Sequence, residues 1–243
     1  MTVQKDDIYA TSHYPVPEFR FDDKVATVFS DMIQRSVPGY GMIISMLKLL
    51  ATRYAQADSH LYDLGCSLGA ATLALRHGIE QPNCQIIAID NSEAMTTRCQ
   101  DNIQADTMPT PVTVQCMDVQ EVEIENASIV VLNFTLQFIP AEQRLELLQK
   151  IYNGLRPNGL LVLSEKLIFE PEFINQSLID LHHDFKRANG YSDLEISQKR
   201  SALDNVLIPE TLDTHQQRLQ QAGFSHSNVW LQCLNFMSLL AWK

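Results

Sequence analysis

The sequence has little positive charge for its size, and this scarcity limits the partners that the protein can bind. Its 18 lysines and arginines are outnumbered by 29 aspartates and glutamates, which gives a net charge of −11 at pH 7. Unaided binding to nucleic acid needs a basic surface, because affinity comes largely from neutralised phosphates. We therefore expect no direct contact with nucleic acid and a small molecule as substrate.

Long apolar runs and paired cysteines are also missing. The longest apolar runs, 127–132 and 160–163, are far shorter than the roughly 20 residues that span a bilayer. The first residues have no apolar signal-peptide segment, and the five cysteines are odd in number and show no C-x-x-C spacing. We expect no membrane association, no disulfides, no cysteine-bound zinc and a cytoplasmic location.

Several catalytic motifs are absent as well. The sequence has no G-x-S-x-G elbow, no Ser-His-Asp order and no close carboxylate pair of the glycosidase type. His182 and His183 are adjacent, so on a helix they point in different directions, and no H-E-x-x-H spacing accompanies them. We expect no metal site, and we find no dedicated general base.

What the sequence does contain is a glycine-rich turn between a strand and a helix, at 61–72. An apolar strand passes Asp63, turns through Gly65 and Gly69, and continues as a helix. Glycine lets the main chain approach a ligand closely, and the N-terminus of the helix offers free N–H groups. The spacing matches neither G-x-G-x-x-G nor the P-loop. The pattern indicates a nucleotide-type site, with a tight connection that binds nothing as the alternative.

Strand and helix patterns alternate around this turn. The pattern predicts an α/β fold of Rossmann type, with a doubly wound, mostly parallel seven-stranded sheet that ends in an antiparallel strand pair. Ligands bind at the carboxyl ends of such strands. We expect strands at 60–64, 85–90, 112–117, 127–133, 160–164, 227–231 and 236–242, with helices between them at 70–77, from 92, at 142–155 and at 211–222.

We interpret residues 1–243 as one domain with two additions. Residues 1–55 form an N-terminal arm and helices that cover the site, and 169–209 form a helical insertion that acts as a lid or a dimerisation element. Lys199 and Arg200 lie in this insertion, either on a solvated face or with the arginine capturing a carboxylate. Arg35 and Tyr40, between the first two helices, are weaker candidates of the same kind.

Polar residues stand where three more strands end. Asp90 can accept hydrogen bonds from ribose hydroxyls, or it can cap the next helix. Asp118 suits an adenine amino group, and a turn aspartate is the alternative. Asn133 needs partners if it is buried, or it caps a helix. Together with Asp63, these residues favour a binding site more strongly than any one of them does alone.

These residues resemble a known fold family. Asp63-x-Gly65-x-Ser67-x-Gly69, followed by Asp90, Asp118 and the closing antiparallel pair, is similar to class I S-adenosylmethionine-dependent methyltransferases, with Ser67 where a glycine is usual. A closer resemblance covers nearly the whole chain. Four runs, 29–40, 62–72, 130–138 and 182–191, continued by 195–200, resemble the carboxy-S-adenosyl-L-methionine synthases.

The resemblance implies an unusual reaction. Prephenate would lose carbon dioxide and hydroxide to become phenylpyruvate. The hydroxide would remove a methyl proton from S-adenosyl-L-methionine, and the sulfonium ylide would capture the carbon dioxide to give carboxy-S-adenosyl-L-methionine. A partner tRNA carboxymethyltransferase would then use this product to make 5-oxyacetyluridine at the tRNA wobble position. A conventional methyltransferase and a non-catalytic S-adenosylmethionine-binding module are the alternatives.

The resemblance also implies a homodimer without a metal and assigns roles to individual residues. Arg200 would hold the new carboxylate and, with Tyr40, act in catalysis. The implied ligand contacts are the methionine part at Gly65, Cys66 and Ser67, the ribose at Asp90 and Asn91, the adenine at Asp118 and Val119, and further contacts at Tyr40 and Asn133.

Overall fold

The structure is a computed structural model that describes residues 4–243, so the first three residues of the predicted arm lie outside the described residues. In chain order the elements are α1 Asp23–Ser36, α2 Tyr40–Tyr54, β1 His60–Leu64, α3 Ala70–Arg76, β2 Gln85–Asp90, α4 Glu93–Ala105, β3 Val112–Cys116, β4 Ala127–Asn133, η1 Leu136–Phe138, η2 Ala141–Gln143, α5 Arg144–Gly154, β5 Leu155–Lys166, α6 Glu172–Ala188, α7 Asp193–Leu203, α8 Leu212–Ala222, β6 His226–Cys233 and β7 Phe236–Trp242.

The sheet has the predicted topology. Its order is β3-β2-β1-β4-β5-β7-β6, and the first five strands of this order run parallel. β7 runs antiparallel to both β5 and β6. The order reverses direction between β1 and β4, and a parallel sheet binds ligands at such a switch point.

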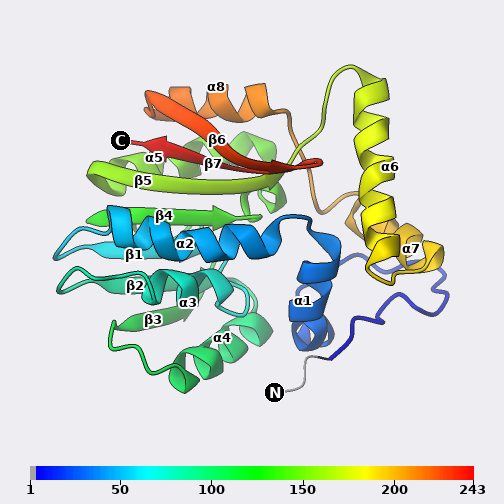
Figure 1. The fold of residues 1–243 in the computed structure, drawn as a ribbon, viewed down its shortest axis with the longest axis horizontal. Helices are drawn as coiled ribbons and strands as arrows, with labels where there is room; N and C mark the ends of the chain where they lie inside the picture. Colours follow the sequence, from blue (N-terminus) through cyan, green and yellow to red (C-terminus); the bar gives the residue numbers. More distant parts are fainter. Residues whose placement is uncertain (1–3) are drawn as a thin grey trace.

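Helices cover both faces of the sheet, as Figure 1 shows. On one face, Leu61 and Ile129 pack against α2 and α3. On the other face, the neighbouring residues Tyr62 and Val130 pack against α5 and α8. Successive side chains of a strand point to opposite faces, so a strand buried on both sides must be almost wholly apolar. This requirement explains the apolar run at 127–132.

The N-terminal segment, α1, α6 and α7 lie together beyond the carboxyl ends of the parallel strands (Figure 1). Buried Asp6 connects them, because its carboxylate accepts a hydrogen bond from the Tyr191 hydroxyl at 2.5 Å and lies 3.8 Å from the Lys199 ammonium. The backbone N–H of Asp6 donates to Asp31 in α1 at 2.7 Å. The predicted lid therefore packs against the predicted arm.

Several boundaries differ from the sequence expectation; for example, β6 is longer than the expected 227–231. α5 begins at Arg144 rather than 142, since residues 141–143 form a 3-10 turn. β5 begins at Leu155, because Leu155 already pairs with Ala127 before the register shifts to the pair of Leu160 with Ile129. Asn158 takes a left-handed φ of 62° in this irregular stretch of the strand. Among residues 4–243, no helix is long and apolar enough to cross a membrane.

Candidate active site

A cavity of about 630 Å³ opens where the parallel strands end, beneath α1, α6 and α7. Ten of the residues that the sequence predicted for the site line it, although they come from distant parts of the chain. They are Tyr40, Gly65, Cys66, Ser67, Asp90, Asn91, Asp118, Val119, Asn133 and Arg200. The fold therefore brings these ten residues to one cavity, whereas Asp63 and the weaker candidate Arg35 do not line it.

The glycine turn shapes the floor of this cavity. The N–H groups of Gly65 and Cys66 both donate to the carbonyl of Ile89, at 2.7 and 2.8 Å, so the turn is held against the end of β2. Gly65 has a left-handed φ of 86°, and a Cβ there would collide with the side chain of Thr135. Glycine is thus required at this position for both conformation and space.

Asp90 and Asp118 accept backbone hydrogen bonds in turns, and both also line the cavity. The carboxylate of Asp90 accepts the N–H of Ser67 at 2.9 Å and that of Ser92 at 3.0 Å, and burial raises its pKa. Ser92, not Asp90, caps α4. Asp118 accepts the N–H of Gln120 at 2.9 Å. A carboxylate has further lone pairs, so both remain able to accept ligand hydroxyl or amino groups.

Asn133 and Asn235 both line the cavity with a buried side-chain oxygen that lacks a hydrogen-bond donor within the described part of the chain. Asn133 is the one that the sequence predicted. Its buried side-chain Oδ1 has no hydrogen-bond partner among residues 4–243, so the alternative role as a helix cap is wrong. The next residue, Phe134, has a left-handed φ of 62°. A buried acceptor without a partner costs roughly 1–3 kcal/mol. A ligand donor in the cavity would remove this cost, which fits a polar ligand at this strand end.

The remaining groups at the floor are unsuited to proton transfer or nucleophilic attack. Hydrogen bonding with Cys99 and burial raise the pKa of the Cys66 thiol, which keeps it protonated. Burial raises the pKa of Tyr40, as does the nearby Asp63. Burial also raises the pKa of Asp63 to about 6, but its carboxylate accepts the Thr72 hydroxyl at 2.5 Å. The floor positions a ligand rather than attacking it.

The opposite wall of the cavity is cationic, and only Lys199 and Arg200 of it were candidates from the sequence. Lys166, Lys186, Lys199 and Arg200 all line the cavity, and we call these four residues the cationic wall. Arg200 is exposed, whereas Lys199 is buried beside Asp6, so the expected solvated face is wrong for the lysine. A protein of net charge −11 thus presents concentrated positive charge to its cavity.

Arg35 lies outside this cavity, which corrects its candidacy. It ends α1 and forms an ion pair with Asp31 at 2.7 Å. Its guanidinium also donates to the carbonyl of Asp6 and lies 4.0 Å from the ring centroid of Tyr191. These contacts hold the N-terminal segment against the lid, so Arg35 has a structural role.

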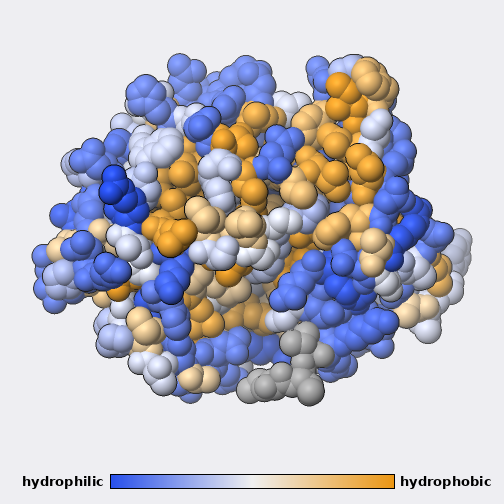
Figure 2. Space-filling view, viewed as in Figure 1, coloured by the Kyte–Doolittle hydropathy of each residue, from blue (hydrophilic) through white to orange (hydrophobic). Residues whose placement is uncertain are grey.

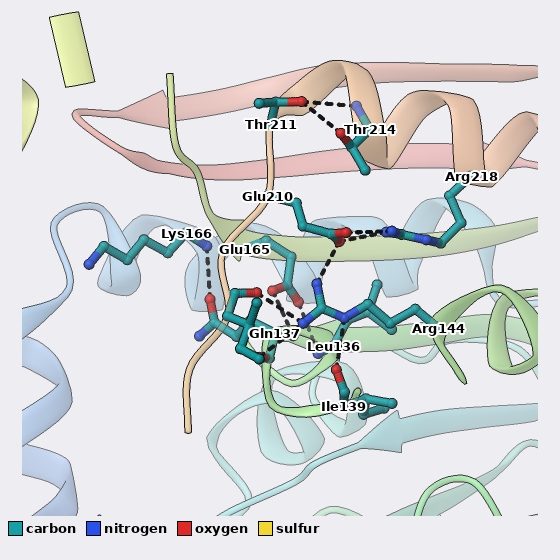
Figure 3. A network of polar contacts seen from close by, with 11 residues as sticks. Leu136, Gln137, Ile139, Arg144, Glu165, Lys166, Glu210, Thr211, Thr214 and Arg218 are labelled. Carbon is teal, nitrogen blue, oxygen red and sulfur yellow. Dashed lines mark hydrogen bonds and ion pairs between the residues drawn. The ribbon is translucent and has the colours of Figure 1, made fainter. Parts of the chain in front are cut away.

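A buried polar network supports the rim of the cavity, as Figure 3 shows. The fully buried guanidinium of Arg144 donates to the carbonyls of Ile139 and Ile208, at 2.8 and 2.9 Å, and pairs with Glu210 at 2.5 Å. The carboxylate of Glu165 accepts the N–H groups of the first two residues of η1, both at 3.0 Å. The network therefore holds η1 and the segment that returns from α7 against the end of β5.

Several lining residues carry no signal in the sequence. Lys166 follows a strand and Lys186 lies on an amphipathic helix, and such lysines are usually solvated. Only the burial of α6 and α7 above the sheet reveals their position. Within the described part of the chain, no cluster of three His, Cys, Asp or Glu side chains is arranged to hold a metal ion.

The fold, with its cavity at the strand ends, is that of the class I S-adenosylmethionine-dependent methyltransferases. A family model described as "Methyltransferase domain" matches residues 61–159. A putative S-adenosylmethionine-dependent methyltransferase of Methanococcus maripaludis superposes with a TM-score of 0.58 at 19% identity, covering 95% of this chain and 96% of the other. Human N-acetylserotonin methyltransferase gives a TM-score of 0.60 at 16% identity, with 91% and 55% covered.

Sequence relatives narrow the class to a family. A carboxy-S-adenosyl-L-methionine synthase of Citrifermentans bemidjiense is 61% identical over 244 residues, and the match covers 100% of both chains. One of Shewanella piezotolerans is 58% identical over 243 residues with the same coverage. The chain belongs to the carboxy-S-adenosyl-L-methionine synthase family, and it is an enzyme.

The glycine turn generates a prediction with a matched control. Gly65 and Gly190 have nearly equal left-handed φ angles, 86° and 85°, but a Cβ on Gly190 would meet open space. Gly190→Ala should therefore cost only the conformational strain, roughly 1–2 kcal/mol. Gly65→Ala adds a collision and should cost about 2–5 kcal/mol.

Thermal unfolding and calorimetric titration with S-adenosylmethionine check this prediction. Gly190→Ala should bind the ligand as the parent does, whereas Gly65→Ala should lose most of its affinity. Equal behaviour of the two variants would show that the space above Gly65 is unimportant.

Proposed function

We propose that the enzyme converts S-adenosyl-L-methionine and prephenate to carboxy-S-adenosyl-L-methionine and phenylpyruvate. The curated relatives are named for this product. The observation that carries the proposal is a cavity with two unlike walls. One wall offers acceptors for an adenosyl group at Asp90 and Asp118, and the other is the cationic wall, which suits an anionic second substrate.

The chemistry is balanced without a protein base. Prephenate, a dicarboxylate, releases one carboxylate as carbon dioxide and its ring hydroxyl as hydroxide, leaving phenylpyruvate. The hydroxide takes a proton from the sulfonium methyl, which forms water and a sulfonium ylide. The ylide carbon then bonds to carbon dioxide and becomes a carboxymethyl group. The protein contributes position and electrostatic stabilisation, consistent with the protonated thiol and tyrosine at the floor.

Each lining residue that the sequence predicted has a place in this proposal. Asp90 and Asn91 would accept from the ribose hydroxyls, and Asp118 from the adenine amino group beside the apolar Val119. The unpartnered Oδ1 of Asn133 would accept from the ligand. The methionine part would lie along Gly65, Cys66 and Ser67, with Tyr40 above it. These assignments use the acceptors that the folded chain leaves free.

Arg200 would bind the newly formed carboxylate. It lies on α7, at the exposed edge of the cavity. The planar guanidinium can donate two parallel hydrogen bonds to a carboxylate, a geometry that a neutral methyl group cannot use. Arg200 would therefore bind the carboxylated product in preference to S-adenosylmethionine. Residues 169–209 would act as a lid over the cavity.

The product would leave for another enzyme in the cytoplasm. We propose that a tRNA carboxymethyltransferase uses it to form 5-oxyacetyluridine at the wobble position. The net charge of −11 supports a division of labour in which this enzyme does not itself bind the tRNA.

Mass spectrometry tests the reaction directly. Incubation with S-adenosylmethionine and prephenate should convert the nucleoside to a species heavier by one carbon dioxide, with phenylpyruvate formed in equal amount. Recovery of unchanged S-adenosylmethionine under conditions where it binds would overturn the proposal. S-adenosylhomocysteine formed with an added acceptor would instead indicate conventional methyl transfer, and binding with no reaction of any kind would indicate a binding module.

The role of Arg200 gives a second test. Arg200→Ala should weaken the binding of carboxy-S-adenosylmethionine by about 1.5–3 kcal/mol, because a charged hydrogen-bonding partner is lost. Binding of S-adenosylmethionine should change little, since its methyl group offers no acceptor. Titration calorimetry with each ligand measures both values. Equal losses for the two ligands would remove Arg200 from this role.

We also propose a homodimer, supported by apolar surface on the insertion. Phe173 and Leu181 on α6 are 70% and 49% exposed, and Figure 2 shows hydrophobic surface over the side of the molecule that carries α6. Such exposed apolar patches are costly in water and often mark interfaces. A second copy of the chain would cover this face.

Light scattering at micromolar concentration tests the dimer. The parent chain should have twice the monomer mass, and Phe173→Glu with Leu181→Glu should give monomers, because a buried unpaired charge opposes association. Tyr14→Glu, at an exposed residue of the N-terminal segment, should leave the mass unchanged. A monomeric parent would contradict the proposal.

A further inference from the structure

Two lysines of the cationic wall, Lys166 and Lys186, have no acidic partner. Among residues 4–243, neither ammonium group has a hydrogen-bond acceptor or a carboxylate within ion-pair distance, although both lysines line the cavity. Lys186 is only 8% exposed. Removing an unpaired charge from water costs several kcal/mol, so such groups normally have a partner.

The other two cations of the wall differ from this pair. Lys199 has Asp6 at 3.8 Å and the Ser36 hydroxyl at 3.2 Å, so it already belongs to the contacts that hold the lid. Arg200 is exposed to solvent. Half-buried Lys166 and buried Lys186 are therefore the two lysines of the cavity without a direct acidic partner among residues 4–243. Asp204 and Asp6 favour their charged forms only from beyond ion-pair distance.

The surrounding structure holds both lysines in place. Lys166 follows Glu165 of the buried network, and its backbone N–H donates to the Gln137 side chain at 3.0 Å (Figure 3). Lys186 lies one helical turn after His182, whose Nε2 is 2.8 Å from the carbonyl of Ser36. Residues four apart share a helix face, so the packing of His182 directs Lys186 into the cavity as well.

Burial and neighbouring cations disfavour the charged form of both lysines. Burial lowers the pKa of Lys186 to about 7, with further lowering by Lys199 and Lys166. Burial and the nearby Arg200 lower the pKa of Lys166. An anion placed between the lysines would reverse these penalties, because it stabilises the charged form of each.

We propose that Lys166 and Lys186 form a carboxylate subsite that binds the second substrate, separate from Arg200. The identity of that substrate as prephenate rests on the proposed function. The structure thus assigns two positions for carboxylates in one cavity: one at the lysines on β5 and α6, and one at Arg200 on α7.

The reaction indicates which carboxylate of prephenate the lysines hold. One carboxylate loses its charge as it departs as carbon dioxide, while the other remains on phenylpyruvate. Ammonium groups on the departing carboxylate would stabilise the ground state more than the transition state and would slow its loss. The lysines therefore bind the retained carboxylate, which leaves the other free to decarboxylate beside the sulfonium methyl. Phenylpyruvate should bind at the same lysines.

Calorimetry on the full chain tests the subsite. The protein is saturated with S-adenosylhomocysteine, which has no methyl group to react, and titrated with prephenate and with phenylpyruvate. Lys166→Met and Lys186→Met keep the length of the side chain and remove its charge. Each substitution should lower the affinity for prephenate and for phenylpyruvate by about tenfold or more. The affinity for S-adenosylmethionine should stay within about twofold of that of the parent. Lys48→Met, at an exposed residue on α2 outside the cavity, is the control.

Several outcomes would overturn the subsite. Unchanged affinity for both acids in the two variants would do so, as would an equal loss of S-adenosylmethionine affinity, which indicates a structural role. Slower turnover at unchanged prephenate affinity would make Lys186 a proton acceptor instead. Parent-like product formation by both variants would reject the subsite and leave the proposed function standing. Lysine-dependent binding of both acids without any carboxy-S-adenosylmethionine would support the subsite and reject the proposed function.

Discussion

The buried guanidinium of Arg144 is the interaction on which the cavity most depends. It donates to the carbonyl of Ile139, just after η1. It also donates to Ile208 and pairs with Glu210, both in the segment between α7 and α8. Glu165 completes this junction from β5. A charge without exposed surface is tolerated only when every donor has a partner. Ile139 lines the cavity, and Ile208 and Glu210 flank the lining residue Pro209. The rim of the cavity is therefore held by the same bonds that stabilise the arginine.

The distribution of charge follows from this arrangement. The outside is acidic, while the cavity combines carboxylates at the ends of β2 and β3 with lysines from β5, α6 and α7. A sulfonium ligand and an anionic acid need opposite surroundings, and the two walls provide them. In the proposed reaction the same layout makes a dedicated base dispensable, because the site would act through position and electrostatics rather than through a reactive side chain.

Much of the fold could be predicted from the sequence, because local rules determine it. Alternating apolar runs and capped helices predicted an open, mostly parallel sheet with a closing antiparallel pair, and the structure has this sheet. The strand-end residues Asp90, Asp118 and Asn133 could be predicted for the same reason, since parallel strands end at one edge. The boundary at Leu155 could not, because pairing with Ala127 across the sheet decided it.

The sequence by itself determined the glycine turn at 61–72, the order of elements and the family, since each depends on residues close together in the chain or on long matching runs. Only the tertiary structure decided which cations serve the site. It placed Arg35 in a structural ion pair and Lys199 beside Asp6, and it brought half-buried Lys166 and buried Lys186 to the cavity without a direct acidic partner among residues 4–243. The physical reason is that a lysine's role depends on its solvation and on its charged neighbours, which come from distant segments.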